Sequence, residues 1–463
     1  MSRQSNSRRG TESAILKAIV VARQPPEPKV QVAGLDPDNA LLDRVQKCSF
    51  DYFLNEVNPA NGLIADKSRD GWPASIAAVG LALAAYPAAV ERGYWERDEA
   101  VERTLTTLRF FARARQGTEA DASGYKGFFY HWLDMDTGKR VWKCELSTVD
   151  SALLFAGALC AAQYFDRNSA EETEIRALAD KLYRRADWQW AQNGEATVTH
   201  GWKPGTKFIK YRWRGYDEAI LLYVLGLGSP TFPLPPESYA AFCATYRWKT
   251  IYGTELLYAG PLFIHQLSHV WIDLREIQDD FMRHRGLDYF ENSRRATYLQ
   301  QEYAIRNPRQ FPMYGELCWG LTGSDGPGPT TLQIDGVNRK FFDYRDRGAP
   351  YGPDDGTLAP WAVAASLPFA PEIVLPTLRY FSESVELVQD EDYGFKATFN
   401  PLFPHESGNP FGWVSPWNYG INQGPIVVMI ENFRSDLVWG LMRNCPYVVN
   451  GLRRAGFQGG WLD

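Results

Sequence analysis

The stretch Gly215–Pro235 reads GYDEAILLYVLGLGSPTFPLP and sets the pattern from which the fold can be inferred. Its apolar residues recur at helical spacing: Ile220, Leu221, Val224 and Leu225. The acidic pair Asp217 and Glu218 precedes them, and Pro230 stops the helix after two glycines. The stretch therefore predicts a short buried helix with acids in its first turn. These acids either complement the helix dipole or place a catalytic carboxylate at the rim of a helical barrel.

The composition is that of a globular protein with a large core. The chain has 463 residues, of which 45% are hydrophobic and 22% charged. Aromatic residues make up 14%, which suggests that some of them line a ligand surface where sugars or other partly apolar faces stack. The formal net charge is −6 and no basic block is present, which argues against nucleic acid or an anionic membrane as partner.

The cysteines and the N-terminus give little sign of metal binding, disulfides or export. The six cysteines show no CxxC pair or regular spacing, and Cys160 lies in an apolar run typical of a buried thiol. The apolar stretch near the N-terminus is short and broken by Lys17, without a clear cleavage site. We expect a cytoplasmic protein, with a periplasmic one as the alternative. We also expect residues 1–37 to be disordered or loosely packed and residues 38–463 to form a single domain.

Apolar and amphipathic helical segments alternate along the chain, about twelve in all. Ala74–Arg92 and Thr148–Tyr164 are apolar nearly all round, as inner helices are, whereas Asp98–Arg115 is amphipathic like an outer helix. Between them Gly117–Cys144 reads as a loop or small hairpin. With no βαβ alternation and no solenoid period, the pattern predicts an all-α (α/α)6 barrel whose long loops form a bowl. The other predicted helices are Asn39–Asn58, Glu171–Gln192, Pro236–Trp248, Leu262–Met282, Leu287–Arg306, Leu358–Phe369, Glu372–Ser384 and Gly424–Met442.

Several acids fall at the predicted starts of inner helices, close to aromatic loops. Asp150 and Glu145 lie at one such start, and Asp217 and Glu218 at another. Glycoside hydrolysis needs one protonated carboxyl group and a second carboxylate that activates water or attacks, so this pattern favours a glycosidase. Each acid has a structural alternative. Asp150 could cap its helix or form a salt bridge, Glu145 could lie on the surface, and Glu431 could be a paired core acid.

His265 and His269 are four residues apart, a spacing that can bind zinc on a helix. The segment HQLSH lacks the glutamate of the HExxH motif, and no third ligand is evident. We therefore expect no metal, and hydrogen bonds from these histidines to hydroxyl groups or to Asp273. Motifs for serine nucleophiles, phosphate loops and dinucleotides are absent from the sequence, and no cofactor is expected.

Five ordered blocks resemble a known family. They read CELSTVDSALLFAG, GYDEAILLYVLGLGSPTFPLP, FIHQLSHVWIDLR, YGELCWGLTGSDGP and QGPIVVMIENFRS and span Cys144–Ser435, somewhat under two thirds of the chain. They look like the glucoamylase-like family that contains glycoside hydrolase family 144, a module of which also occurs in cyclic β-1,2-glucan synthases. The resemblance implies an (α/α)6 barrel and an enzyme acting on β-1,2-linked glucan. It implies most typically an endo-acting hydrolase that inverts the anomeric centre and releases short sophoro-oligosaccharides.

The resemblance also implies roles for individual residues. Glu218 is the expected proton donor, with Asp150 and Glu145 as the neighbouring acids, while the identity of the base is left open. The residues expected to line the glucan groove are His131, Trp132, Tyr216, His265, Glu316, Trp319 and Asp325. From the residues alone, Asp325 in SDGP is also typical of a turn.

Two departures from the family pattern bear on the chemistry. Where relatives often read GIDQGP this chain has GINQGP with Asn422, and where they read GFxDxFN it has GFKATFN with Ala397. The loss of one or two acids leaves three alternatives open beside endo hydrolysis. These are exo action, transglycosylation, and a catalytically weakened protein that binds glucan.

Overall fold

A computed structural model describes residues 37–383, 388–389, 393–404 and 411–463. Residues Asp38–Asp463 pack as one compact unit. Residues 1–36 of the predicted N-terminal segment lie outside the described residues, so the predicted domain division stays a prediction. No helix among the described residues is long and apolar enough to cross a membrane.

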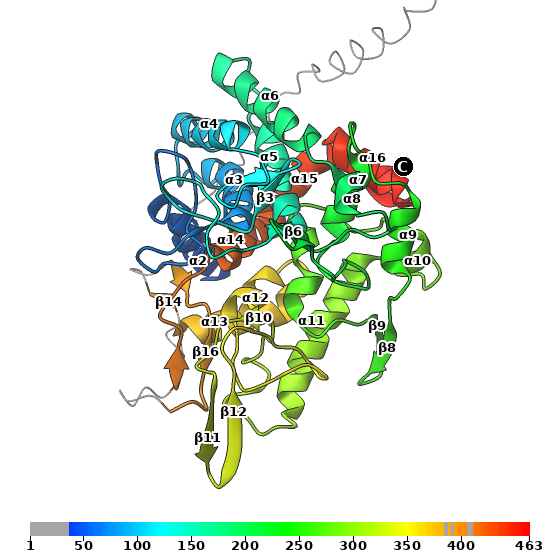
Figure 1. The fold of residues 1–463 in the computed structure, drawn as a ribbon. Coiled ribbons are helices and arrows are strands. Elements are labelled where there is room, and N and C mark those ends of the chain that lie inside the picture. Colours follow the sequence, from blue (N-terminus) through cyan, green and yellow to red (C-terminus); the bar gives the residue numbers. More distant parts are fainter. Residues whose placement is uncertain (1–36, 384–387, 390–392, 405–410) are drawn as a thin grey trace, which may run out of the picture. The chain divides into compact units, whose positions relative to one another are not determined.

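The inner layer of this unit is made of helices that are buried on nearly every side (Figure 1). α3 packs between α5 and α14, α5 also contacts α8, and α14 also contacts α12. Two of the helix starts are capped by serine side chains: Ser75 accepts from the backbone N–H of Ala78, and Ser147 from that of Asp150. The bounds are α3 (Ile76–Glu91), α5 (Thr148–Tyr164), α8 (Ile220–Gly228), α12 (Pro360–Ala365) and α14 (Gly420–Ser435).

Amphipathic helices cover this inner layer. α4 buries Leu105 and Leu108 and packs on α6, which in turn packs on α5, while α13 packs on α12. The outer helices are α2 (Pro37–Asn55), α4 (Arg97–Arg113), α6 (Ala170–Arg184), α9 (Glu237–Cys243), α11 (Tyr289–Arg306) and α13 (Pro371–Glu383). The inner and outer layers confirm the predicted (α/α)6 class.

One predicted helix, Leu262–Met282, is wrong. The chain there forms two 3-10 turns, η1 (Leu262–His265) and η2 (Leu267–Val270), and then runs without helix to α10 (Asp280–Arg283). Gln266, between the turns, is buried and donates its side-chain amide to the carbonyl of Ala362 at 2.6 Å and to Ser366 at 2.7 Å. These bonds hold the side chain of Gln266 to another segment of the chain and so favour two tight turns over one continuous α-helix.

Other boundaries differ from the predictions where a cap or a left-handed residue intervenes. Predicted Glu171–Gln192 is two helices, because Asp187 caps a new one, and predicted Gly424–Met442 is interrupted at Asp436, whose φ of 58° is left-handed. Asp217 and Glu218 precede α8 instead of lying in its first turn. The additional helices are α7 (Trp188–Ala191), α15 (Leu437–Arg443), α16 (Pro446–Arg454) and η3 (Gly460–Leu462).

Short antiparallel strands occur in the long loops. A five-stranded sheet in the order β2-β3-β5-β6-β7 joins the predicted hairpin region to the start of α5, with Phe129 opposite Ser147 and Ser147 opposite Gly201. Its strands are β2 (Gly124–Tyr125), β3 (Phe128–Tyr130), β5 (Leu146–Ser147), β6 (Gly201–Lys203) and β7 (Lys207–Phe208). The two-stranded pairs are β1 (Ala74–Ser75) with β4 (Trp132–Leu133), β8 (Trp248–Ile251) with β9 (Thr254–Leu257), β10 (Gly323–Ser324) with β13 (Arg345–Asp346), β11 (Thr330–Ile334) with β12 (Val337–Phe341), β14 (Val388–Gln389) with β15 (Gly394–Phe395), and β16 (Phe399–Asn400) with β17 (Trp413–Val414). The β11–β12 hairpin projects away from the helices (Figure 1).

Close packing in the inner layer depends on glycine. A Cβ at Gly157 of α5 would stand 1.9 Å from the carbonyl oxygen of Gly80 in α3, so only glycine allows this approach of the two helices. Most cysteines are buried in the same unit, Cys160 among them, as predicted. The buried cysteines are Cys144, Cys160, Cys243, Cys318 and Cys445.

Candidate active site

The first part of the site is a histidine held between two carboxylates at the start of α5. Pairing of β3 with β5 brings His131 next to Glu145, whose carbonyl accepts the His131 backbone N–H at 2.9 Å. The imidazole Nδ1 lies 2.8 Å from Glu145 Oε1, and Nε2 lies 3.6 Å from Asp150 Oδ2. Asp150 also accepts a hydrogen bond from the Ser147 hydroxyl, but the residue that caps α5 is Ser147, so the capping alternative for Asp150 is wrong and the salt-bridge alternative is met by His131.

The charges of this triplet stabilise one another. Burial alone would lower the pKa of His131, but Asp150 and Glu145 outweigh it and raise the pKa to about 9. Burial would raise the pKa of Glu145, but the hydrogen bond and charge of His131 lower it to about 2. At neutral pH the triplet therefore holds an imidazolium and an ionised Glu145. The imidazolium stacks on Trp132, with ring centroids 3.6 Å apart.

Glu218 lies in the turn before α8 and is positioned by its backbone. Ser268 of η2 donates its hydroxyl to the Glu218 carbonyl at 3.1 Å and accepts the N–H of Leu221 at 3.2 Å. Burial, together with the charges of Asp150 and Asp346, raises the pKa of the Glu218 carboxyl to about 7. This carboxyl group is therefore a proton donor at neutral pH.

Asp217, the other half of the acidic pair, has a different role. Its carboxylate accepts the backbone N–H of Ala219 at 2.9 Å, which closes the turn that leads into α8. Burial and the neighbouring charge of Glu218 raise the pKa of Asp217 well above its ordinary value.

Tyr216 and His265 form a hydrogen-bonded pair beside this turn. The Tyr216 hydroxyl lies 3.1 Å from His265 Nδ1, and His265 Nε2 lies 3.2 Å from the carbonyl of Ala259. The carbonyl can only accept, so Nε2 carries the proton and Nδ1 accepts from the tyrosine. Burial lowers the pKa of His265 to about 4, which keeps the ring neutral.

The predicted hydrogen bonds from the histidines to hydroxyl groups are confirmed. His265 bonds to the Tyr216 hydroxyl, and His269 Nε2 lies 3.0 Å from the Ser293 hydroxyl, whereas the alternative partner, Asp273, is not used. Asp273 instead accepts from Arg275 and Arg443 in ion pairs of 2.8 Å and 2.7 Å. Among the described residues no group of three or more His, Cys, Asp or Glu side chains is arranged to hold a metal ion.

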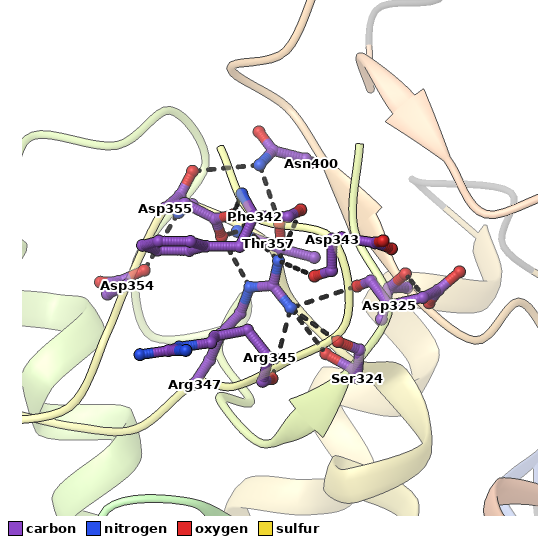
Figure 2. Close-up of polar contacts among 12 residues, drawn as sticks. Ser324, Asp325, Phe342, Asp343, Arg345, Arg347, Asp354, Asp355, Thr357 and Asn400 are labelled. Atoms are coloured by element: carbon purple, nitrogen blue, oxygen red, sulfur yellow. Dashed lines mark hydrogen bonds and ion pairs between the residues drawn. The ribbon is translucent and has the colours of Figure 1, made fainter. Parts of the chain in front are cut away.

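A buried arginine organises a second wall of the site (Figure 2). The guanidinium of Arg347 makes a bidentate pair with Asp355 at 2.7 and 2.9 Å, and both side chains are fully buried. It also donates to backbone carbonyls on both sides of the β10–β13 pair: those of Ser324, Asp325, Phe342, Asp343 and Arg345. One side chain therefore fixes the segment that carries Asp325 and the segment that carries Asp346.

Two residues of this wall were not predicted, Tyr344 and Asp346. Desolvation of its hydroxyl and the charges of Asp346, Asp66, Glu218 and Asp325 raise the pKa of Tyr344 well above its ordinary value, although 61% of the residue is exposed. These residues lie in the segment FFDYRDRGAP, whose alternating acids and aromatic rings were the available signal. Which of its acids faces the site depends on the Arg347 contacts, which sequence spacing does not specify.

Asp66, a third residue that was not predicted, lies at an aromatic edge of the site. It accepts the indole N–H of Trp72 at 3.2 Å, and Lys67 Nζ lies 3.8 Å from the centre of the same ring system. Trp142 packs edge-on against Trp72, with centroids 4.9 Å apart, and 55% of Trp142 is exposed. These rings provide the aromatic surface near the acids that the composition suggested.

Two residues predicted to line the groove lie elsewhere. Trp319 is fully buried and donates its indole N–H to Thr377 of α13 at 3.0 Å, so it is part of the core. Glu316 is exposed, and no described contact connects its carboxylate with Glu218 or the acids around it. Asp325 is buried and accepts hydrogen bonds from two hydroxyl groups, so it supports the wall.

The two departures from the family pattern border the same wall. Ala397 is buried and precedes Thr398, whose hydroxyl donates to Asp325 at 2.7 Å. Asn422 is buried in the first turn of α14, and the N–H of Gly420 in that turn donates to the carbonyl of Asp66 at 3.0 Å. The two positions where the family resemblance led us to expect an acid therefore adjoin acids that this chain does have.

The arrangement combines a carboxyl group with a pKa near 7, an ionised Glu145, further carboxyl groups, an imidazolium and exposed aromatic rings. A proton donor near neutrality facing carboxylates fits acid–base cleavage of an acetal. Aromatic rings at the edge fit the apolar faces of sugar rings.

Comparison with known proteins supplies an independent line of evidence. Residues 210–446 match a family model described as "Putative glucoamylase". A curated relative from Parabacteroides distasonis, named exo β-1,2-glucooligosaccharide sophorohydrolase (non-reducing end), is 29% identical over 452 residues. The match covers 90% of this chain but 58% of the relative, so the chain spans somewhat over half of that protein's length.

Solved structures match over nearly the full chain. A "putative glucoamylase" from Bacteroides uniformis is 32% identical with a TM-score of 0.81, and the match covers 94% of this chain and 100% of that one. An endo-β-1,2-glucanase from Chitinophaga pinensis, solved with sophorotriose and glucose, is 26% identical with a TM-score of 0.79, covering 92% and 100% of the two chains.

Proposed function

Because this chain belongs to the family described as "Putative glucoamylase", we propose that it is a glycoside hydrolase that cleaves β-1,2-linked glucan. Relatives named for exo and for endo action on β-1,2-linked glucose polymers both align over at least 90% of the chain and support this substrate class. The proposed substrate is the polymer or its oligosaccharides, and the proposed reaction is hydrolysis.

The observation that carries the proposal is the state of Glu218. The pKa of its carboxyl group is raised to about 7, so roughly half of this group carries a proton at pH 7 and can donate it. In the proposed reaction Glu218 protonates the glycosidic oxygen as the bond to the anomeric carbon breaks. The His131 imidazolium and the nearby tryptophans would bind sugar hydroxyls and ring faces.

The finer proposal is endo action with inversion of the anomeric centre, which rests on the family resemblance. Exo release of sophorose is the second candidate, and the name of the P. distasonis relative favours it. The two differ in their early products, because endo action gives a distribution of lengths whereas exo action gives the disaccharide from the start.

Linear β-1,2-glucan is the substrate that tests the proposal. New reducing ends should form. Glu218→Gln should lower their rate of formation by a factor of about 10²–10⁴, while glucan binding persists. Chromatography of the products by length and NMR of the newly formed anomer separate endo from exo action and inversion from retention. Saturable binding without any turnover by the unmodified protein would refute hydrolysis, and products longer than the substrate would indicate transglycosylation.

A further inference from the structure

Seven acids lie in or beside the site, and five of them are already occupied. Asp66 accepts from Trp72, and Asp217 from the backbone of Ala219. Glu145 and Asp150 face His131, and Asp325 accepts from the hydroxyl groups of Thr398 and Ser415. Of these seven described acids, Glu218 and Asp346 are the two whose carboxyl groups have no hydrogen-bond or ion-pair partner on another residue. These two retain free oxygen lone pairs for water or substrate.

The backbone of Asp346 is held in place, whereas its carboxylate is exposed. In β13 it lies opposite Gly323 of β10, and the neighbouring residue pair is Ser324 with Arg345. The Arg347 guanidinium locks this pair by bonding carbonyls on both strands (Figure 2). A Cβ at Gly323 would stand 2.9 Å from Asp346 Oδ1, so the absence of a side chain there leaves room for the carboxylate.

A hydrogen-bonded path connects Asp346 with the turn that carries Glu218. Gly323 follows Thr322, whose hydroxyl accepts the N–H of Phe263 in η1 at 3.0 Å. The next turn, η2, carries Ser268, which donates to the carbonyl of Glu218. The two carboxyl groups thus lie on segments that are hydrogen-bonded to each other. The charge of Asp346 contributes to the raised pKa of Glu218.

From this geometry we propose that Asp346 is the catalytic base that partners Glu218, a role that rests on the proposed hydrolase function. Water attacks the anomeric carbon as its bond to the glycosidic oxygen breaks. Glu218 gives its proton to that oxygen, and Asp346 takes the proton that the water loses. One water is consumed, and the two carboxyl groups exchange protons with solvent before the next cycle.

Two substrates distinguish the base from the acid. β-1,2-Glucan needs a proton on its leaving oxygen, whereas 2,4-dinitrophenyl β-sophoroside has a leaving group that departs without one. Asp346→Asn should lose about 10²–10⁴-fold in kcat on both substrates. Glu218→Gln should lose as much on glucan but retain most of its activity on the aryl sophoroside. Asp343→Asn, an identical change in the same exposed segment, should stay within about threefold of the unmodified protein on both.

A second variant separates loss of the base from loss of folding. Gly323→Ala keeps the Asp346 carboxylate but places a methyl group 2.9 Å from it, and should lower kcat with little change in KM or in the unfolding midpoint.

With the small Asp346→Gly variant, azide should restore turnover of the aryl sophoroside and give a glycosyl azide. Activity of Asp346→Asn within tenfold of the unmodified protein on both substrates would overturn the assignment. An unmodified protein inactive on both substrates would instead refute the hydrolase function itself.

Discussion

Replacing Arg347 with methionine should destabilise the protein by about 3–5 kcal/mol, the usual cost of removing one member of a buried ion pair. Arg347 and Asp355 are both fully buried, and their two contacts are 2.7 and 2.9 Å. Without the guanidinium, the Asp355 carboxylate keeps the backbone N–H groups of Phe342 and Thr357 as donors but loses its counter-charge. The carbonyls that Arg347 holds on either side of β10 and β13 also lose their donor.

Guanidinium chloride unfolding followed by tryptophan fluorescence measures this loss as a shift of the midpoint. Arg109→Met is the matched control, because Arg109 pairs with Glu174 at 2.5 Å with both side chains about 40% exposed, and should cost less than about 1 kcal/mol. The double variant Arg347→Met/Asp355→Leu should recover part of the loss, since it removes the stranded charge as well. Equal losses for Arg347→Met and Arg109→Met would refute the reasoning.

Four further predictions concern Glu218, a helix contact and a core acid. The kcat/KM on glucan should fall as pH rises above about 7, where Glu218 loses its proton, and a flat profile to pH 9 would contradict this. The raised pKa of Glu218 gives a stabilising contribution that is fully present below the unfolded pKa and is lost as pH rises through 7. At pH 8, Glu218→Gln should therefore be more stable than the unmodified protein by on the order of 3 kcal/mol, measured as a higher unfolding temperature. Gly157→Ala should lower the free energy of unfolding by about 1–3 kcal/mol, because its Cβ would stand 1.9 Å from the Gly80 carbonyl oxygen. The control Gly440→Ala, whose Cβ would have no atom closer than 3.9 Å, should be neutral or stabilising in the same denaturation assay. Glu431→Gln should lower the free energy of unfolding by about 2–3 kcal/mol, because it leaves Arg92 without its counter-charge. It should leave kcat unchanged, because Glu431 lies about three turns, roughly 16 Å, from the start of α14.

Hydrophobic periodicity predicted the layers of the barrel because it records which faces are buried. α5 was predicted with its correct ends, and Glu431 shows why an acid in an apolar run is ambiguous. Its carboxylate pairs with Arg92 at 2.7 and 2.9 Å and accepts from Gln46, so it is a core acid. Sequence alone gives no sign of a partner more than 300 positions away.

The second wall of the site could not be predicted for the same reason. Its acids are arranged by Arg347, whose contacts range from Ser324 to Asp355 and depend on a register between two-residue strands. Strands this short carry no alternation that a sequence pattern can reveal. The helix predicted at Leu262–Met282 failed because buried polar residues bond to neighbouring elements, and apolar spacing does not register those bonds.

The buried cysteines provide chemical reporters of how the barrel opens. Burial raises the pKa of Cys160, Cys243, Cys318 and Cys445, so these thiols are poor nucleophiles until the structure around them loosens. Cys160 lies inside α5, whereas Cys318 lies in the loop after α11. The order in which a maleimide labels them under native conditions would therefore report, position by position, whether the catalytic loops open independently of the inner helices or only when the whole barrel unfolds.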